Sequence, residues 1–319
     1  MLNSSPLLLV NVEAKFKTGL PISLTLTDTS GATQYVSGMS STGLDTVASG
    51  LTTQNASDGA GWDKLIVPDS AGNTLRVLSP NNGLVGNSSL FSNYFTSYVN
   101  QVWQKYTSTS LSVDTQASFG TVAGKVSSNQ LTFPNNITFA QPTTGDIFSC
   151  STGPFATGSN TEVNAIIPRL AAAFNRSTLL VSEDAPNVDE SQNYQNAITN
   201  HYSRIVHAAN LDGKGYAFPY DDVTPSGGAD QAGTVSSGSV SVFKVTVGGV
   251  GATATAPSSS TDVKAPTRKI GSCFRGNKWD IQKKLNHGSS APSQSPSTPH
   301  STFRDILHKF QQRLHAIRA

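Results

Sequence analysis

The most informative stretch of this sequence is Asp212-Gly213-Lys214-Gly215-Tyr216-Ala217-Phe218-Pro219-Tyr220-Asp221-Asp222-Val223. Its aromatic residues predict a strand at 215–223, and the apolar pattern that follows predicts another at 235–247. Successive side chains of a strand point to opposite faces, so Asp221 and Asp222 are expected on opposite sides of the chain. At most one of these two carboxylates therefore faces any given surface.

Outside this stretch, the sequence pattern predicts strands at both ends of the body of the chain and a block of mixed helices and strands between them. Near the front, Ile22, Leu24 and Leu26 alternate with polar residues, which is typical of a half-buried strand. Further strands are predicted at 65–67 and 75–78. The order predicts an α+β fold in which one β unit, residues 1–30 and 214–250, is split by an inserted mixed α/β unit, residues 31–213.

Helical periodicity marks the mixed block. Apolar residues at three- and four-residue steps predict helices at 89–106, 162–175 and 190–207, and a short helix is expected around 44–51. A polar, β-rich stretch separates the first two long helices. The aromatic face of the 89–106 helix and Trp62 could each stack against a ligand, but core packing is the favoured interpretation for both.

The end of the chain differs from the body in composition. Residues 251–300 are rich in Pro, Ser, Thr and Ala and are predicted to be a linker, followed by a basic amphipathic helix at 301–319. From Ala256 onward there are 11 Lys and Arg against 3 Asp and Glu, whereas the rest of the chain has 11 against 17. The helix could lie on a membrane surface, pack against a partner, or be an extension from an imperfect gene model, which we favour. Membrane contact and nucleic-acid binding are not expected.

Composition favours an extracellular β-rich protein. Only 13% of the 319 residues are charged, and five Asn-x-Ser/Thr sequons occur, at Asn3, Asn55, Asn87, Asn136 and Asn175. The two cysteines, Cys150 and Cys273, do not by themselves define a disulfide. The first residues have neither a basic region nor an apolar run long enough for a signal peptide, so a missing front segment is expected.

Several strings, in this order along the chain, resemble glycoside hydrolase family 64, the thaumatin-like endo-β-1,3-glucanases of fungi and bacteria. Besides the opening stretch, they are Gly19-Leu20-Pro21-Ile22-Ser23-Leu24, Gly61-Trp62-Asp63-Lys64-Leu65, Arg76-Val77-Leu78-Ser79-Pro80-Asn81, Asp146-Ile147-Phe148-Ser149-Cys150, Ile167-Pro168-Arg169-Leu170, Phe174-Asn175-Arg176 and Asn200-His201-Tyr202-Ser203-Arg204. The resemblance implies a thaumatin-like β-barrel or sandwich domain, here incomplete, an inserted α/β domain, and a wide groove between them for an extended β-1,3-glucan chain. It also implies an extracellular, cofactor-free enzyme, expected to be a monomer.

The chemistry implied by the resemblance needs two carboxyl groups. Hydrolysis with inversion uses a protonated acid and an ionised base about 6.5–9.5 Å apart with water between them. The family's acid is a Glu in a Glu-Phe-Thr-like context, which no segment here matches. Its second carboxylate precedes Gly-Leu-Pro, where either Lys15 or Phe16 stands in this sequence. Glu13 is the one carboxylate nearby, and we interpret it as an ordinary strand residue rather than a catalytic one.

The resemblance assigns Asp221 and Asp222 to the substrate cleft, although either could instead cap the turn before Thr224. The histidines show no His-x-x-x-His spacing with a nearby carboxylate, so no metal and no cofactor are expected, and His201 and Tyr202 are interpreted as packing residues. In relatives, the position of Ala171 holds a cysteine that pairs with the equivalent of Cys150. Cys150 is therefore expected to be a free thiol.

Three hypotheses for function follow. The chain is an endo-β-1,3-glucanase, a non-catalytic β-1,3-glucan-binding protein, or an inactive truncated product whose missing early strands leave unpaired edges. Because no glutamate matches the acid context, little or no hydrolysis is expected from this polypeptide.

Overall fold

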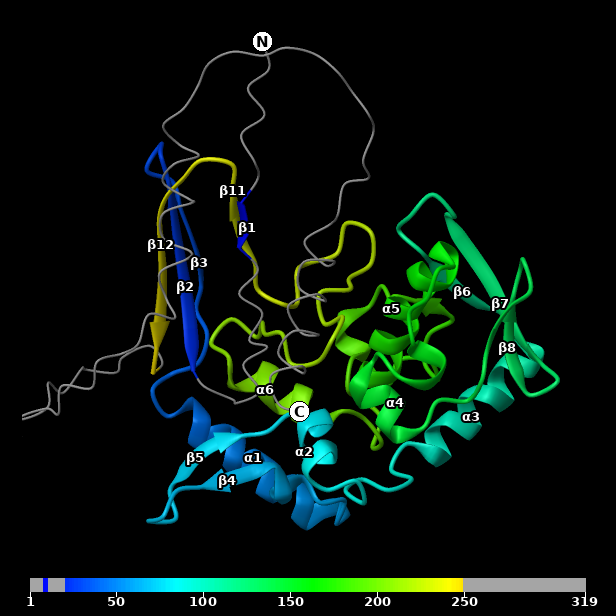
Figure 1. Cartoon of the computed structure of the whole chain (residues 1–319), viewed down its shortest axis with the longest axis horizontal. Helices are drawn as coiled ribbons and strands as arrows, with labels where there is room; N and C mark the ends of the chain where they lie inside the picture. Colours follow the sequence, from blue (N-terminus) through cyan, green and yellow to red (C-terminus); the bar gives the residue numbers. More distant parts are fainter. Residues whose placement is uncertain (1–7, 11–20, 249–319) are drawn as a thin grey trace, which may run out of the picture. The chain divides into compact units, whose positions relative to one another are not determined.

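The structure is a computed structural model that describes residues 8–10 and 21–248. These residues form an α+β fold of helices and several small sheets (Figure 1). No helix among them is long and apolar enough to cross a bilayer. Glu13, the predicted linker at 251–300 and the predicted tail helix at 301–319 lie outside the described residues.

Strands from the two ends of the described chain pair with each other. Strand β2 (Ile22–Asp28) lies between β3 (Thr33–Val36) and β12 (Val240–Val247), and both pairings are antiparallel (Figure 1). The predicted alternation in β2 is confirmed, because Leu24 and Leu26 are buried in a small cluster with Val235. A second antiparallel pair joins β1 (Leu8–Val10) to β11 (Val235–Ser237).

The mixed block contains two further sheets. The larger has the strand order β10-β6-β7-β8-β9, in which β10 is parallel to β6 and the other pairs are antiparallel. Its strands are β6 (Leu111–Asp114), β7 (Thr121–Ser127), β8 (Gln130–Phe133), β9 (Ile137–Phe139) and β10 (Asp184–Ala185). The smaller is a hairpin of β4 (Ile66–Pro68) and β5 (Thr74–Val77), as predicted from the apolar runs on either side of a turn.

The helices are α1 (Gly43–Asp58), α2 (Pro80–Gly86), α3 (Thr96–Ser108), α4 (Thr144–Ser149), α5 (Thr161–Arg176) and α6 (His201–Ala209), with short 3-10 helices η1 (Trp62–Leu65), η2 (Gly153–Phe155) and η3 (Glu190–Gln192). The prediction of a helix at 162–175 is confirmed by α5. Helix α1 is longer than its predicted counterpart and ends at Asp58, followed by Gly59, which caps it in a left-handed conformation.

Two predicted helices are shorter in the structure. The predicted helix at 89–106 begins only at Thr96, because Phe91 and Asn93 have positive φ angles that interrupt it. The predicted helix at 190–207 is reduced to η3 and α6. Tyr194 is left-handed between them, and the side chain of Asn200 accepts a hydrogen bond from Ser203 N, which starts α6 as an N-cap.

Trp62 lies at the centre of an aromatic cluster. Its side chain is fully buried, and its ring lies 4.6–6.2 Å, centroid to centroid, from those of Phe91, Tyr94, Phe148 and His201. Its indole nitrogen donates to Asp58 Oδ2 at 3.0 Å, so its polar atom is also satisfied. The predictions that Trp62 and the aromatic face of α3 belong to the core are confirmed.

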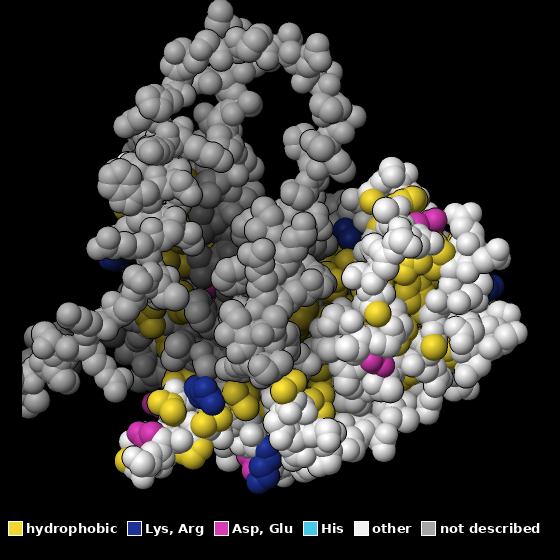
Figure 2. All heavy atoms as spheres, in the orientation of Figure 1, with side chains coloured by type: hydrophobic (Ala, Val, Ile, Leu, Met, Phe, Trp, Pro, Cys, Tyr) yellow, Lys and Arg dark blue, Asp and Glu magenta, His cyan; other side chains and the backbone are white. Residues whose placement is uncertain are grey.

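Few charged side chains are visible on the face drawn in Figure 2, and those that are lie scattered among polar and apolar groups. This agrees with the low charged fraction of the sequence, 13%. Any recognition on the visible described surface therefore has to rely mainly on neutral hydrogen-bonding groups and a few charged side chains of either sign.

Candidate functional site

The two adjacent aspartates lie in a turn rather than in a strand. The predicted strand at 215–223 is wrong: Asp221 N donates to Phe218 O, Val223 N donates to Tyr220 O, and Tyr220 has a φ of 68°. Pro219 removes a backbone donor that a ladder would need. The carboxylate of Asp221 accepts from Ala217 N at 2.9 Å and so closes the turn on itself.

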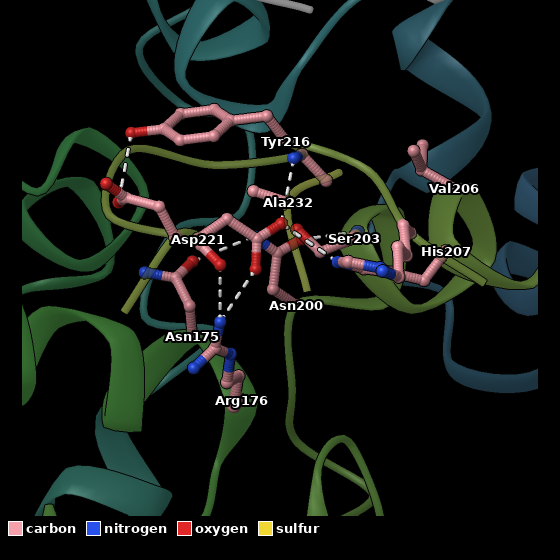
Figure 3. A network of polar contacts seen from close by, with 12 residues as sticks. Asn175, Arg176, Asn200, Ser203, Val206, His207, Tyr216, Asp221 and Ala232 are labelled. Carbon is pink, nitrogen blue, oxygen red and sulfur yellow. Dashed lines mark hydrogen bonds and ion pairs between the residues drawn. The ribbon is translucent and has the colours of Figure 1, made fainter. Parts of the chain in front are cut away.

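Asp221 is fully buried and is surrounded by donors (Figure 3). Arg176 Nη2 donates to its Oδ1 at 3.0 Å, and His207 Nε2 lies 2.8 Å from its Oδ2. Arg176 also donates to the backbone oxygens of Asp221, at 2.7 Å, and of Val223, at 2.5 Å. A buried carboxylate is tolerated only when it is paired in this way.

The two cations come from the ends of two helices. Arg176 is the last residue of α5, and His207 lies in the last turn of α6. The carbonyl end of a helix favours positive charge, so both positions support the cationic forms that Asp221 requires. The turn therefore joins the C-terminal ends of two helices that are separated in sequence.

Both ring nitrogens of His207 face oxygen atoms that can only accept a hydrogen bond. Nδ1 lies 2.9 Å from Gly213 O, and Nε2 lies 2.8 Å from the Asp221 carboxylate. A neutral imidazole can donate from only one nitrogen, whereas the protonated ring donates from both. The geometry therefore favours the imidazolium form of His207.

The electrostatics of the pair follow from these contacts. Burial opposes the charge on His207, but the Asp221 carboxylate and the Gly213 carbonyl outweigh it and raise the pKa of His207. Burial would likewise raise the pKa of Asp221, but His207, Arg176 and the Ala217 amide outweigh it and hold that pKa below its ordinary value. Each shift thus favours the charged form of its group.

The segment around the turn is also held at both ends. Ser37 N donates to Asp212 Oδ2 at 3.0 Å, and Gln116 Nε2 donates to Thr224 O at 2.6 Å. Ser226 Oγ donates to Asp114 Oδ2 at 2.8 Å. These contacts fix residues 212–226 against two other parts of the chain, at Ser37 and at 114–116.

Asp222 differs from its neighbour because it is exposed. Its one described contact is a long hydrogen bond of 3.5 Å from the hydroxyl of Tyr216, which itself accepts from Tyr220 N at 3.1 Å. The carboxylate thus keeps hydrogen-bonding capacity for a bound molecule. Of the two predicted site residues, Asp222 alone presents its carboxylate to solvent.

Other candidates from the sequence are packing residues. His201 and Tyr202 are buried in α6, as predicted, with His201 Nε2 3.1 Å from Ala197 O and its Nδ1 accepting from Arg204 Nε. Within the described residues, no group of three or more His, Cys, Asp or Glu side chains is arranged to hold a metal ion.

Cys150 is buried and forms no disulfide with any described residue. The side-chain nitrogen of Asn175 lies 3.3 Å from Cys150 Sγ and 3.0 Å from Ala171 O, so residues 150 and 171 are close in space. Asn175 itself is fully buried, which removes it as a glycan acceptor in the folded protein. Burial raises the pKa of the Cys150 thiol, which keeps it protonated and unreactive.

The partners of Asp221 were not recognised from the sequence. Arg176 and His207 are 45 and 14 residues away from it, and no spacing rule links them. The available signal was indirect: an ionised carboxylate in an apolar context such as Ala217-Phe218 needs a cation, and Arg176 and His207 both sit among apolar helix residues.

The comparison with models of known protein families shows to which family the chain belongs. The model of glycoside hydrolase family 64, described as β-1,3-glucanase, matches residues 8–247, which is more than half of the chain. The chain belongs to this β-1,3-glucanase family. The predicted resemblance is thereby confirmed, and so is the α+β fold class at the level of the family.

Individual relatives agree with the assignment. The chain is 31% identical over 179 residues to a glucan endo-1,3-β-glucosidase of Cellulosimicrobium cellulans and 32% identical over 176 residues to one of an Arthrobacter species. Each alignment covers 53% of this chain but only 32% of the relative. The chain therefore matches about a third of the length of these two bacterial relatives.

Solved structures of the family share the fold. A laminaripentaose-producing β-1,3-glucanase in complex with laminaritetraose is 31% identical, with a TM-score of 0.62, and the match covers 70% of this chain and 60% of that one. A family 64 β-1,3-glucanase domain from Clostridium beijerinckii has a TM-score of 0.55 at 24% identity, with 72% of this chain and 57% of that one covered.

Proposed function

We propose that this chain recognises β-1,3-glucan. The observation that carries the proposal is family membership together with the likeness, at 31% identity and a TM-score of 0.62, to a glucanase crystallised with laminaritetraose. The exposed carboxylate of Asp222 supports it, because a carboxylate beside a tyrosine hydroxyl is suited to accept hydrogen bonds from sugar hydroxyls. Asp221 acts behind it as a structural residue.

We also propose the finer architecture that the family resemblance implies. Strands β2 and β12 belong to a thaumatin-like β unit made of residues 1–30 and 214–250. Residues 31–213 form the inserted α/β unit, and the glucan lies in a wide groove between the two units. Pairing of β2 with β12 supports the split β unit. An extracellular location, a monomeric state and the absence of a cofactor belong to the same proposal.

For catalysis, we propose that this polypeptide binds glucan with little or no hydrolysis. Cleavage of a glycosidic bond needs a proton donor and a water-activating carboxylate across the same site. None of the four glutamates of the sequence, Glu13, Glu162, Glu183 and Glu190, is followed by Phe-Thr as the family acid is. Hydrolysis with inversion is the second candidate function, and the family match itself favours it.

Two assays on the purified chain test the proposal. We expect retention on insoluble β-1,3-glucan and no retention on insoluble β-1,4-glucan, the control for unspecific adsorption. We expect no release of reducing ends from laminarin above the background without protein. Absence of β-1,3-glucan retention contradicts recognition, whereas laminarin turnover comparable to that of an active family member contradicts the non-catalytic interpretation and supports the enzyme.

A further inference from the structure

The orientation of Asp222 is set by the hydrogen bonds of its neighbours in the turn and not by those of its own side chain. Its neighbour Asp221 accepts hydrogen bonds from Arg176, His207 and Ala217 N, and these are the contacts that fold the turn at 217–223. The backbone oxygens of Asp221 and Val223, on either side of Asp222, are both held by Arg176. The exposed carboxylate of Asp222 is therefore held in place by three buried side chains, Asp221, Arg176 and His207, which we call the buried frame.

Within the buried frame, His207 contacts the segment 213–221 at both of its ends. One ring nitrogen binds Gly213 O, at the start of the segment, and the other binds the Asp221 carboxylate, near its end. Its ring also packs against Tyr194, with centroids 5.8 Å apart. Arg176 by contrast holds only the later end, at Asp221 and Val223. Of these two cations, His207 is therefore the one that forms hydrogen bonds with both ends of the segment 213–221.

We propose that His207 is a positioning residue for glucan recognition: its doubly protonated ring fixes the segment 213–221, so that Asp222 faces the substrate only while His207 carries its charge. This inference rests on the proposed function. The inference goes beyond the proposed function, because it makes glucan binding depend on the protonation of a buried side chain that does not touch the glucan.

The physical reason is the geometry of the neutral ring. When His207 loses a proton, one ring nitrogen carries a lone pair that points at either Gly213 O or Asp221 Oδ2. Two acceptors at about 3 Å repel each other, so one of the two contacts opens. The segment then loses its hydrogen bond at Gly213, or Asp221 loses its hydrogen bond from His207, and in both cases Asp221 loses one of its two cationic partners. Either change loosens the turn that presents Asp222.

The charged and titratable groups that face His207 give the sign of the effect. They are Asp221 from the turn, Arg176 from α5 and Tyr194 from the segment before α6. Burial and Asp221 raise the pKa of Tyr194 well above its ordinary value, so it stays neutral, and Arg176 stays charged. Because the pKa of His207 is raised above 6.5 in the folded protein, the contribution of its charge is present below that value and is lost as the pH rises through the folded pKa.

The test measures the dissociation constant of laminaritetraose by calorimetry between about pH 5.5 and about pH 9.5, a range that brackets histidine titration. For the wild-type protein we expect binding to weaken about tenfold as the pH rises through the His207 pKa, since one charge-assisted hydrogen bond is lost. His207→Gln, which cannot titrate, is expected to bind about tenfold more weakly at the acid end with no such step.

His201→Gln is the matched control. His201 is a buried histidine of the same helix, but it contacts Ala197 and Arg204 rather than the turn, and burial lowers its pKa. We expect this variant to keep the wild-type pH profile. If the step is absent from the wild type, or persists in His207→Gln, the inference is wrong.

A measurement on the free wild-type protein covers the case in which His207→Gln does not fold. The ¹⁵N shifts of the His207 ring are expected to show two protonated nitrogens at the acid end of the pH range, and amide exchange at Ala217 is expected to speed up when that ring titrates. A ring that is neutral already at the acid end overturns the inference. Absence of laminaritetraose binding at every pH instead overturns the proposed function, and the role assigned to His207 in recognition falls with it.

Discussion

Replacing Asp221 by Asn is expected to lower the free energy of unfolding by about 3–5 kcal/mol, because it leaves the charge of buried Arg176 without its anionic partner. The side chain of Asp221 is fully buried, so solvent cannot compensate for the lost charge. The ion pair of Arg176 with Asp221 is 3.0 Å long, and His207 loses its carboxylate acceptor in the same variant. Urea or thermal denaturation followed by circular dichroism measures the change.

Asp222→Asn is the matched control for this variant. The same chemical change one residue later removes an exposed carboxylate whose described contact is 3.5 Å long, so we expect a change within about 0.5 kcal/mol. Equal losses of stability in the two variants would contradict the distinction between a buried frame and an exposed carboxylate.

The stability contributed by the Asp221 pair is also expected to depend on pH in a defined direction. The pKa of Asp221 is lowered in the folded state, so its contribution is present above the unfolded value of 3.8 and is lost as the pH falls through the folded pKa. The same denaturation experiment repeated at acid pH should therefore show the wild type converging on Asp221→Asn. A constant difference between the two proteins down to the most acidic conditions is the opposing result.

Replacing Trp62 by Ala is expected to destabilise the fold by about 3–5 kcal/mol through the cavity it leaves. Trp62 is fully buried and packs against Phe91 and Tyr94, from the segment before α3, and against Phe148 from α4. Its removal also leaves Asp58 without the indole donor. The midpoint of urea denaturation should fall accordingly.

Tyr35→Ala provides the exposed counterpart, since that side chain is 72% exposed on β3, and its effect should stay within about 0.5 kcal/mol. A Trp62→Ala protein as stable as Tyr35→Ala would show that Trp62 does not anchor the core. It would reopen the interpretation of Trp62 as a ligand-stacking residue.

Much of the fold could be predicted where one physical signal dominates locally. The alternation of Ile22, Leu24 and Leu26 predicted β2, and the apolar spacing of residues 162–175 predicted α5. Core packing was also the favoured interpretation for Trp62, and its side chain is buried. In each of these cases the local pattern and the tertiary environment favour the same structure.

The predictions that failed depend on contacts between distant residues. Apolar spacing favoured a helix from Ser89, but Phe91 and Asn93 take left-handed conformations and Phe95 N donates instead to Thr144 Oγ1. Aromatic residues favoured a strand at 215–223, but Arg176 and His207 draw Asp221 inward and fold a turn. Neither partner can be inferred from local spacing, because helix ends and loops meet only in the tertiary structure.

The candidate site was predicted in part. The sequence pointed to Asp221 and Asp222 and to a difference between them, although the alternation of a strand is not its cause. Burial and hydrogen bonding now distinguish the two: Asp221 is enclosed by Arg176, His207 and Ala217 N, and Asp222 is exposed beside Tyr216. Glu13 lies outside the described residues, so its interpretation as an ordinary strand residue stays a prediction.

Calorimetric titration of laminaritetraose into wild-type protein and Asp222→Asn, at a pH below the His207 titration, tests most directly whether the exposed aspartate meets the glucan. We predict saturable binding by the wild type and a loss of about tenfold or more in the variant, as expected when a charged acceptor for a sugar hydroxyl becomes neutral. Equal affinities in the two proteins would contradict the account.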